Sequence, residues 1–186
     1  MLKKDLRSQY RGRRYNLSSQ QLVDASLSIA NQLLKIPIWE YSYYHLFLSI
    51  EEKKEVDTSF ILSILQGKDK NVVLPKMLDD RRLLNLLLTD STRIKKNHWN
   101  IPEPVEGLEV PAKKLDVMFL PLLAFDLNGN RVGYGKGFYD TLLLQCRPDI
   151  VKVGLSLFPA EERIEDTEPH DIPMDYCVTP DRIYSF

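Results

Sequence analysis

Hydrophobic positions near the start of the chain recur every four residues. Leu2, Leu6 and Tyr10 would form one apolar stripe, and they predict a helix over residues 2–15. The other faces of this helix are polar and strongly cationic. The stripe therefore indicates a helix that packs on one side and presents positive charge on the other.

A second helix is predicted from Ser18 to Lys35, where apolar residues again repeat at helical spacing. Ser18 and Gln21 have the spacing of a capping box, in which each side chain bonds the backbone N–H of the other residue. Pro37 cannot continue a helix and should end it. Nothing in this helix suggests chemistry, so we expect a scaffold role.

Apolar runs of strand length alternate with helix-like segments in the rest of the chain. The expected strands are 43–50, 71–76, 83–88 (a strand or a short hairpin), 151–157 and an edge strand at 176–184. A helix capped by Asp57 or Thr58 and ending at Gln66, before Gly67, is expected between the first two strands. This alternation predicts an α/β fold of three layers, Rossmann-like, with a largely parallel sheet of mixed edges and helices on both faces. We expect one domain over residues 1–186, with a Pro-rich surface loop at 101–111.

Ligands of parallel sheets bind at the carboxyl ends of the strands. Glu55 follows the first predicted strand, and Pro75 and Lys76 end the second. These residues are expected on the functional rim, although an exposed loop carboxylate is the simpler interpretation of Glu55.

The stretch 116–144 organises the chain. It contains an apolar run of strand length, a two-residue turn at Asn128-Gly129, a Gly-x-Gly-x-Gly loop at 133–137 and a helix-length apolar segment. Glycines let backbone N–H groups crowd around an anion, and a helix start adds unpaired donors. The order strand, glycine loop, helix is therefore typical of a phosphate site.

Two cations accompany this glycine loop, Arg131 and Lys136, and they would balance the charge of a polyphosphate. Neither a dinucleotide fingerprint nor a P-loop fits, because the third glycine comes one residue early and Phe138 follows Gly137. On glycine spacing alone, a hairpin whose aromatic residues merely pack stays an open alternative.

Charge is unevenly distributed along the chain. The whole chain has a net charge of −1, but residues 1–14 carry six basic side chains and one acidic side chain. Lys3 and Arg7 are four residues apart, so both can point at one anion. A solvated face, a nucleic-acid arm and a phosphate clamp are all compatible with this pattern.

Composition is that of an ordinary globular chain, with 44% hydrophobic residues and no apolar run of membrane-spanning length. No secretory signal is evident, and Cys146 and Cys177 fit neither a disulfide framework nor a zinc site. We expect a cytoplasmic monomer that binds small molecules, without a nucleic-acid or membrane partner.

An acidic segment, 161–175, carries seven carboxylates and His170. Mg²⁺ prefers a few carboxylates together with phosphate oxygens, so part of this segment is a candidate for a metal site beside the glycine loop. Most of these carboxylates are expected to be solvated surface.

The string LPLLAFDLNGNRVGYGKGFYDTLL resembles the signature of the 5-formyltetrahydrofolate cyclo-ligase family, also called 5,10-methenyltetrahydrofolate synthetase. Further family features occur in order along the whole chain. They are Lys3 and Arg7, Glu55 and Thr58, Leu74 and Pro75, Glu103 and Pro104, His170 and Asp171, and Val178 and Thr179.

The resemblance implies an ATP- and Mg²⁺-dependent cyclisation of 5-formyltetrahydrofolate to 5,10-methenyltetrahydrofolate, with Lys136 and Arg131 as catalytic cations. It implies ATP binding by two segments, Lys3, Lys4, Asp5, Leu6 and Arg7, and Arg131, Val132, Gly133, Tyr134, Gly135, Lys136, Gly137, Phe138 and Tyr139.

The same resemblance implies a reduced folate as the second substrate. Its expected contacts are Glu55, Tyr134, Gly135, Lys136, Gly137 and Phe138. Asp140 and Asp171 match the positions of the metal carboxylates.

Two residues depart from the family pattern. Phe138 replaces a frequent tyrosine, and Asn100 replaces a frequent glycine, which affects the expected fit of the folate rather than the reaction. The alternatives are a nucleotide-binding relative without this activity and an RNA-binding module that uses the basic first helix. The net acidic remainder of the chain disfavours the RNA-binding module.

Overall fold

The structure is a computed structural model that describes residues 1–78 and 82–186. Its helices are α1 (Lys3–Tyr15), α2 (Ser19–Leu33), α3 (Ser59–Gly67) and α4 (Phe138–Gln145), with 3₁₀ turns η1 (Glu51–Lys53) and η2 (Ala112–Lys114). Its strands are β1 (Tyr43–His45), β2 (Asn71–Met77), β3 (Leu83–Leu87), β4 (Ile94–Lys96), β5 (Pro102–Pro104), β6 (Val117–Pro121), β7 (Ala124–Phe125), β8 (Arg131–Val132), β9 (Val151–Leu155), β10 (Tyr176–Val178) and β11 (Ile183–Ser185).

A seven-stranded sheet in the order β11-β10-β9-β6-β1-β2-β3 forms the centre of the molecule. The five inner strands are parallel, and the edge strands β3 and β11 are antiparallel to their neighbours. The predicted α/β fold with a largely parallel sheet and mixed edges is therefore confirmed.

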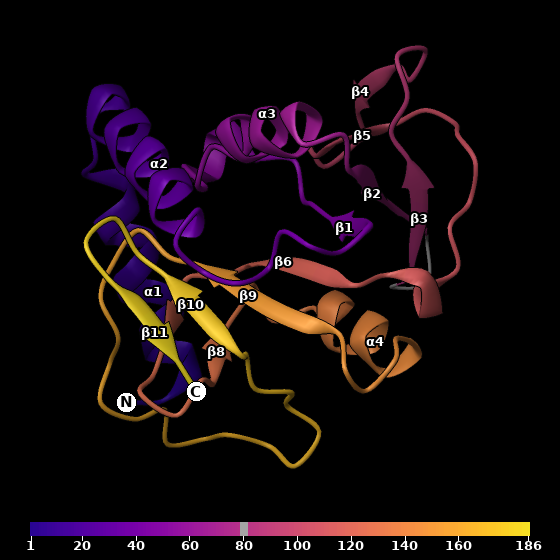
Figure 1. Cartoon of the computed structure of the whole chain (residues 1–186). Helices are drawn as coiled ribbons and strands as arrows, with labels where there is room; N and C mark the ends of the chain where they lie inside the picture. The colour runs from indigo at the N-terminus through magenta and orange to yellow at the C-terminus, as the bar shows by residue number, and fades with distance from the viewer. Residues whose placement is uncertain (79–81) are drawn as a thin grey trace.

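Helices cover both faces of this sheet (Figure 1). The larger apolar cluster joins α2 and α3 to one face, through residues such as Ile29 and Ile61. A second cluster joins α4 to the opposite face, through Leu142 and Leu143. The capping box predicted at Ser18 and Gln21 is present at the start of α2.

Helix α1 packs outside these layers, on the two-stranded sheet of β7 and β8. Leu6 and Tyr10 are buried there against Leu123, Ala124 and Val132. The predicted stripe is correct for these two residues, whereas Leu2 is half-exposed at the N-cap position.

The strand order reverses between β1 and β6. From β1 the chain crosses through α3 to β2 on one side, whereas β6 lies on the other side of β1 and leads through α4 to β9. A crevice opens outside the carboxyl ends of the strands at such a point. The segments that follow β1 and β6 are thereby brought together.

Several predicted boundaries were wrong. The run 43–50 is a strand only to His45, and the apolar run after Asp116 breaks into β6 and β7. The turn that joins β7 and β8 has Leu127 and Asn128 at its centre, since the Gly129 N–H donates to the Asp126 carbonyl. Gly129 follows in a left-handed conformation, with φ of 81°.

Two other segments contain more strand than predicted. Residues 176–184 divide into β10, an inner strand, and β11, with Pro180 in the turn between them. The Pro-Glu-Pro segment is extended as expected, but it pairs with β4 in a hairpin instead of forming a loop. None of the helices in the described ranges is long and apolar enough to cross a membrane.

Candidate active site

A cavity, here called the main cavity, lies at the crevice beside β1 and β6. It contains most of the predicted site residues. They are Lys3, Arg7, Glu55, Arg131, Gly133, Tyr134, Gly135, Lys136, Gly137, Phe138, Tyr139, Asp140 and Asp171. Residues from the first helix, the loop after β1, the glycine loop and the acidic segment therefore meet at one place. Because Lys3 and Arg7 line this cavity, the structure favours the phosphate-clamp interpretation of the first helix.

Four residues expected in the ATP site do not line the main cavity. Leu6 and Val132 are fully buried in the cluster beneath α1. Lys4 and Asp5 lie on the exposed side of that helix. Their positions follow from the helical period, which turns only Lys3 and Arg7 of this segment toward the cavity.

The glycine loop owes its shape to two left-handed residues. Gly135 has φ of 90° and Gly137 has φ of 71°. The Arg7 guanidinium packs directly on Gly135, where an added Cβ would lie 3.3 Å from the guanidinium carbon. The Arg7 Nε also donates to the Gly133 carbonyl at 3.0 Å. Glycine at position 135 thus permits both the backbone conformation and the close approach of Arg7.

Helix α4 begins at the end of this loop. Gly137 is its N-cap residue, and no side chain caps the helix. The N–H groups of the first turn of a helix lack partners within that helix and favour negative charge. The loop and the helix start together offer backbone donors beside Lys136 and Arg131.

Two ion pairs link the cations of the main cavity to its carboxylates. Arg131 is bonded to Asp140 at 2.6 Å, and Lys3 is bonded to Asp171 at 2.5 Å. Burial acts to raise the pKa of Asp171, but the Glu168 N–H and the Lys3 ammonium outweigh it and lower that pKa. Each carboxylate predicted to hold metal therefore already neutralises a cation predicted to hold phosphate.

Glu55 is a buried carboxylate and not the exposed loop residue of the simpler interpretation. Its side chain accepts hydrogen bonds from the Ile50 N–H and the Tyr134 hydroxyl, both at 2.8 Å. Burial raises the pKa of Glu55, and its hydrogen bonds and the charges of Arg14 and Lys53 oppose that rise. Lys53 also lies over the Tyr134 ring, 4.2 Å from its centroid.

Arg14 supports this carboxylate and was not predicted from the sequence. Its guanidinium is buried, donates to the Tyr134 hydroxyl at 2.8 Å and donates to the Leu122 carbonyl at 2.5 Å. Tyr134 in turn donates to Glu55. The available signal was the spacing of Arg14 from Arg7, two helical turns along the same face.

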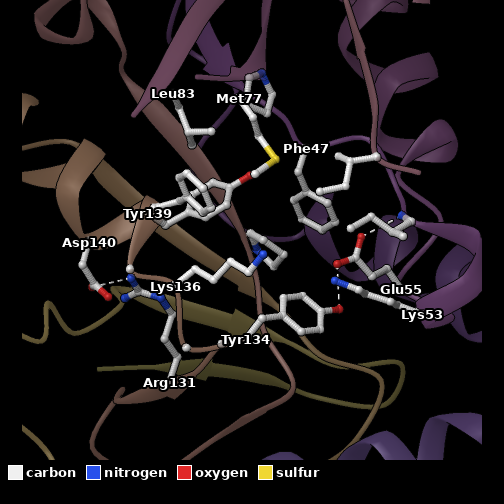
Figure 2. A pocket seen from close by; sticks show the side chains of 18 of the residues that line it. Phe47, Lys53, Glu55, Met77, Leu83, Arg131, Tyr134, Lys136, Tyr139 and Asp140 are labelled. Carbon is white, nitrogen blue, oxygen red and sulfur yellow. Dashed lines mark hydrogen bonds and ion pairs between the residues drawn. The ribbon is translucent and has the colours of Figure 1, made fainter. Parts of the chain in front are cut away.

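The apolar wall of the main cavity also escaped prediction. Its side chains come from the loop after β1, from β2 and β3, and from the start of β5; they include Phe47, Leu48, Ile50, Met77, Leu83, Ile101 and Pro102. Figure 2 shows Lys136 extending between the Arg131–Asp140 pair and the group formed by Glu55, Lys53 and Tyr134. The site therefore has a cationic end, an apolar wall and a buried carboxylate.

Asp140 and Asp171 fit a magnesium ion that is shared with phosphate. In the described residues, one oxygen of each carboxylate makes no hydrogen bond. No group of three or more metal-ligating side chains occurs in that part of the chain. Mg²⁺ typically uses one or two carboxylates plus substrate phosphates, so this donor set suits it.

A sequence model of the 5-formyltetrahydrofolate cyclo-ligase family matches residues 1–180. The chain belongs to that family. The 5-formyltetrahydrofolate cyclo-ligase of Haemophilus influenzae is 30% identical over 92% of this chain and 94% of its own length. That of Mus musculus is 32% identical over 77% of this chain and 74% of its own length. As a 5-formyltetrahydrofolate cyclo-ligase family member, the chain is a ligase of folate metabolism.

Solved structures of related proteins have the same fold. A 5,10-methenyltetrahydrofolate synthetase from Aquifex aeolicus is 30% identical, with a TM-score of 0.85, and covers 100% of this chain and 93% of its own. The synthetase from Mycoplasma pneumoniae is 22% identical, with a TM-score of 0.76 and coverage of 97% and 99%. The family members therefore share this sheet.

Proposed function

We propose that this ligase converts 5-formyltetrahydrofolate and ATP to 5,10-methenyltetrahydrofolate, ADP and phosphate, with Mg²⁺ bound. The observation that carries the proposal is the composition of the main cavity. The Arg131–Asp140 pair beside the glycine loop and the buried carboxylate Glu55 lie on opposite sides of the Lys136 side chain. Such a cavity suits one ligand that carries a polyphosphate and a second ligand whose ring carries N–H donors.

The triphosphate would bind at the glycine loop. Lys136, Arg131, Lys3 and Arg7 supply positive charge there, and the start of α4 supplies backbone donors. Arg7 is held against the loop by its bond to the Gly133 carbonyl. Helix α1 would therefore hold Arg7 beside the phosphates.

Asp140 and Asp171 would hold Mg²⁺, which when bound neutralises charge on the triphosphate. Both carboxylates are paired with cations, Asp140 with Arg131 and Asp171 with Lys3. Arg131 and Lys3 are the groups proposed to hold phosphate, so we expect nucleotide binding to release these carboxylates.

The pterin ring of the folate would bind at Glu55. Each carboxylate oxygen has two lone pairs, and the bonds from Ile50 and Tyr134 occupy one on each oxygen. The remaining lone pairs can accept adjacent N–H groups of the ring. The apolar wall of Phe47, Met77 and Leu83 would cover the ring faces.

The reaction requires activation of the formyl oxygen, which is a poor leaving group. The γ-phosphoryl group is transferred to that oxygen, and ADP is released. The N10 amine then attacks the formyl carbon, N10 gives up its proton, and phosphate departs with the former formyl oxygen. Phosphoryl transfer depends mainly on positioning and charge neutralisation, which Lys136 and Arg131 can provide.

The test mixes purified protein with Mg-ATP and 5-formyltetrahydrofolate and follows methenyl absorbance together with ADP release. We expect both signals to rise in equal amounts and both to be lost without folate or Mg²⁺. ADP release without methenyl product would instead indicate the nucleotide-binding relative considered above. If folded protein gave neither methenyl absorbance nor ADP release, the proposal would be rejected.

A further inference from the structure

A second cavity, here called the basic cavity, lies beside the main one. Its volume is about 270 Å³, and it lies between the C-terminal half of α1 and the turn η1. Four cationic side chains line it, Arg11, Arg14, Lys53 and Lys54, against one carboxylate, Glu52. The proposed reaction uses none of these four cations directly.

The cations of the basic cavity form no direct ion pair in the part of the chain that the structure describes, and Glu55 is the buried carboxylate whose charge acts on both Arg14 and Lys53. Arg14 donates only to two backbone carbonyls and the Tyr134 hydroxyl, and its buried Nε has no partner. Lys54 donates to the backbone carbonyls of Tyr15 and Leu17. Glu52, the one carboxylate of the lining, is bonded at 3.2 Å to Lys96.

Positive charge therefore accumulates at this cavity. Burial lowers the pKa of the Lys53 ammonium; Glu55 opposes this effect, whereas Lys136, Arg11 and Arg14 add to it. A buried guanidinium such as Arg14 is costly unless an anion compensates it, and Glu55 is shared between Arg14 and Lys53. An anion bound here would gain charge-assisted hydrogen bonds from several donors at once.

We propose that the basic cavity is an oxyanion site. One source of the oxyanion is the glutamyl tail of the folate, a choice that rests on the proposed function; the other is free phosphate. Lys53 and Tyr134 line both cavities, so a ligand at the Tyr134 wall reaches the edge of the second cavity. The tail is the favoured source, since the cations of the main cavity are committed to the triphosphate.

The deciding variant is Arg11→Gln. Arg11 is exposed and makes no hydrogen bond or ion pair within the described residues, so its removal should leave the fold intact. The matched control is Arg13→Gln on the same helix. Arg13 lies over the Tyr10 ring at 4.6 Å and lines neither cavity.

Binding of 5-formyltetrahydrofolate with one and with three glutamates is measured by calorimetry at low salt. The wild type should bind the triglutamate more tightly, and Arg11→Gln should reduce that advantage by about two- to fivefold, as for one exposed ion pair. The Arg13→Gln protein should keep the wild-type preference for the triglutamate. Monoglutamate binding should change less than triglutamate binding.

A parallel titration with inorganic phosphate, followed by thermal shift, tests the other source. Stabilisation by phosphate that Arg11→Gln weakens, with no effect of tail length, would assign the site to free phosphate. Equal responses of the Arg11 and Arg13 variants to both probes would overturn the oxyanion site. Wild-type protein that binds no folate would reject the proposed function instead, and the phosphate titration would still decide this inference.

Discussion

Arg14 and Glu55 are buried charges that meet only through the Tyr134 hydroxyl. The guanidinium donates to that hydroxyl, and the hydroxyl donates to the carboxylate. This arrangement fixes the direction of the Tyr134 proton and leaves the outer lone pairs of Glu55 free to accept from a ligand. Burial raises the pKa of Glu55, so the charge of Arg14 helps to keep the carboxylate ionised.

Glu55→Gln tests this role. The substitution keeps the volume but removes the charge, and an amide presents an N–H donor where the pterin also donates. We expect the KM for folate to rise by about tenfold or more, the typical effect of losing a hydrogen bond to a charged group, with the KM for ATP nearly unchanged. Steady-state kinetics with each substrate varied in turn measures this, and an unchanged folate KM would count against the pterin contact.

His45 makes stability depend on pH. It is fully buried, and burial lowers its pKa to about 4, although the Asn85 side chain acts in the opposite direction. The unfolded chain takes up this proton below about pH 6.5, whereas the folded chain does so only below about 4. Stability from this residue is therefore complete above pH 6.5 and is lost as the pH falls toward 4.

His45→Leu should remove this component. Urea unfolding measures the free energy of unfolding at each pH. Between pH 6.5 and pH 4 we expect this free energy to fall by about 3 kcal/mol more for the wild type than for the variant, because the pKa difference of His45 is linked to stability. His98→Gln, at an exposed position, is the control and should behave as the wild type does. If the free energy of unfolding changed with pH in the same way for the wild type and for His45→Leu, the result would contradict this role of His45.

The local structure around single residues could be predicted where a short sequence motif determines it, and not where burial in the fold determines it. The left-handed glycines, the capping box and the cations of the loop all follow from short sequence patterns. Glu55 reads as an exposed loop residue, because its burial depends on Tyr134 and Arg14, which are distant in the chain. The apolar wall likewise looks like ordinary core residues.

At the scale of elements, α1 joins the glycine loop to the acidic segment. The Lys3 N–H donates to Asp166, the Lys3 ammonium is bonded to Asp171, and Arg7 packs on Gly135. The apolar side of the helix, Leu6 and Tyr10, fixes its position on β7 and β8. The helix is thus one structural unit that orients two cations at the main cavity.

Lys3→Met should separate the packing of α1 from the positive charge that it brings to the main cavity. The methionine keeps the length of the side chain, so the docking of α1 should survive, while an ammonium is lost from the proposed phosphate site. We expect the KM for ATP to rise by about tenfold, as for one charge-assisted hydrogen bond, with little change for folate. Arg13→Met, which removes a charge from the same helix outside the cavity, should leave both KM values unchanged; equal effects of the two variants would refute the clamp.

Elements were predicted best where one apolar period ran without interruption. The helices and the parallel strands β2 and β9 follow that rule. Strand β1 is shorter than its apolar run because the chain leaves the sheet after His45 to build the wall of the main cavity. The β10–β11 hairpin was missed because its turn at Pro180 looks like an interruption within one strand.

At the scale of the whole molecule, the reversal of strand order between β1 and β6 explains why distant segments share one site. The loops after these strands carry Glu55 and the glycine loop, and α1 and the acidic segment close the sides. The fold class followed from the alternation of strands and helices. The strand order did not, because short apolar runs carry no information on which runs are neighbours.

The central claim is that this cavity transfers the γ-phosphoryl group of ATP to the formyl oxygen. The most direct measurement supplies 5-formyltetrahydrofolate labelled with ¹⁸O in the formyl group and analyses the released phosphate by mass spectrometry. We expect one labelled oxygen in the phosphate for each methenyl product formed. Unlabelled phosphate, with the label lost to water, would contradict the account.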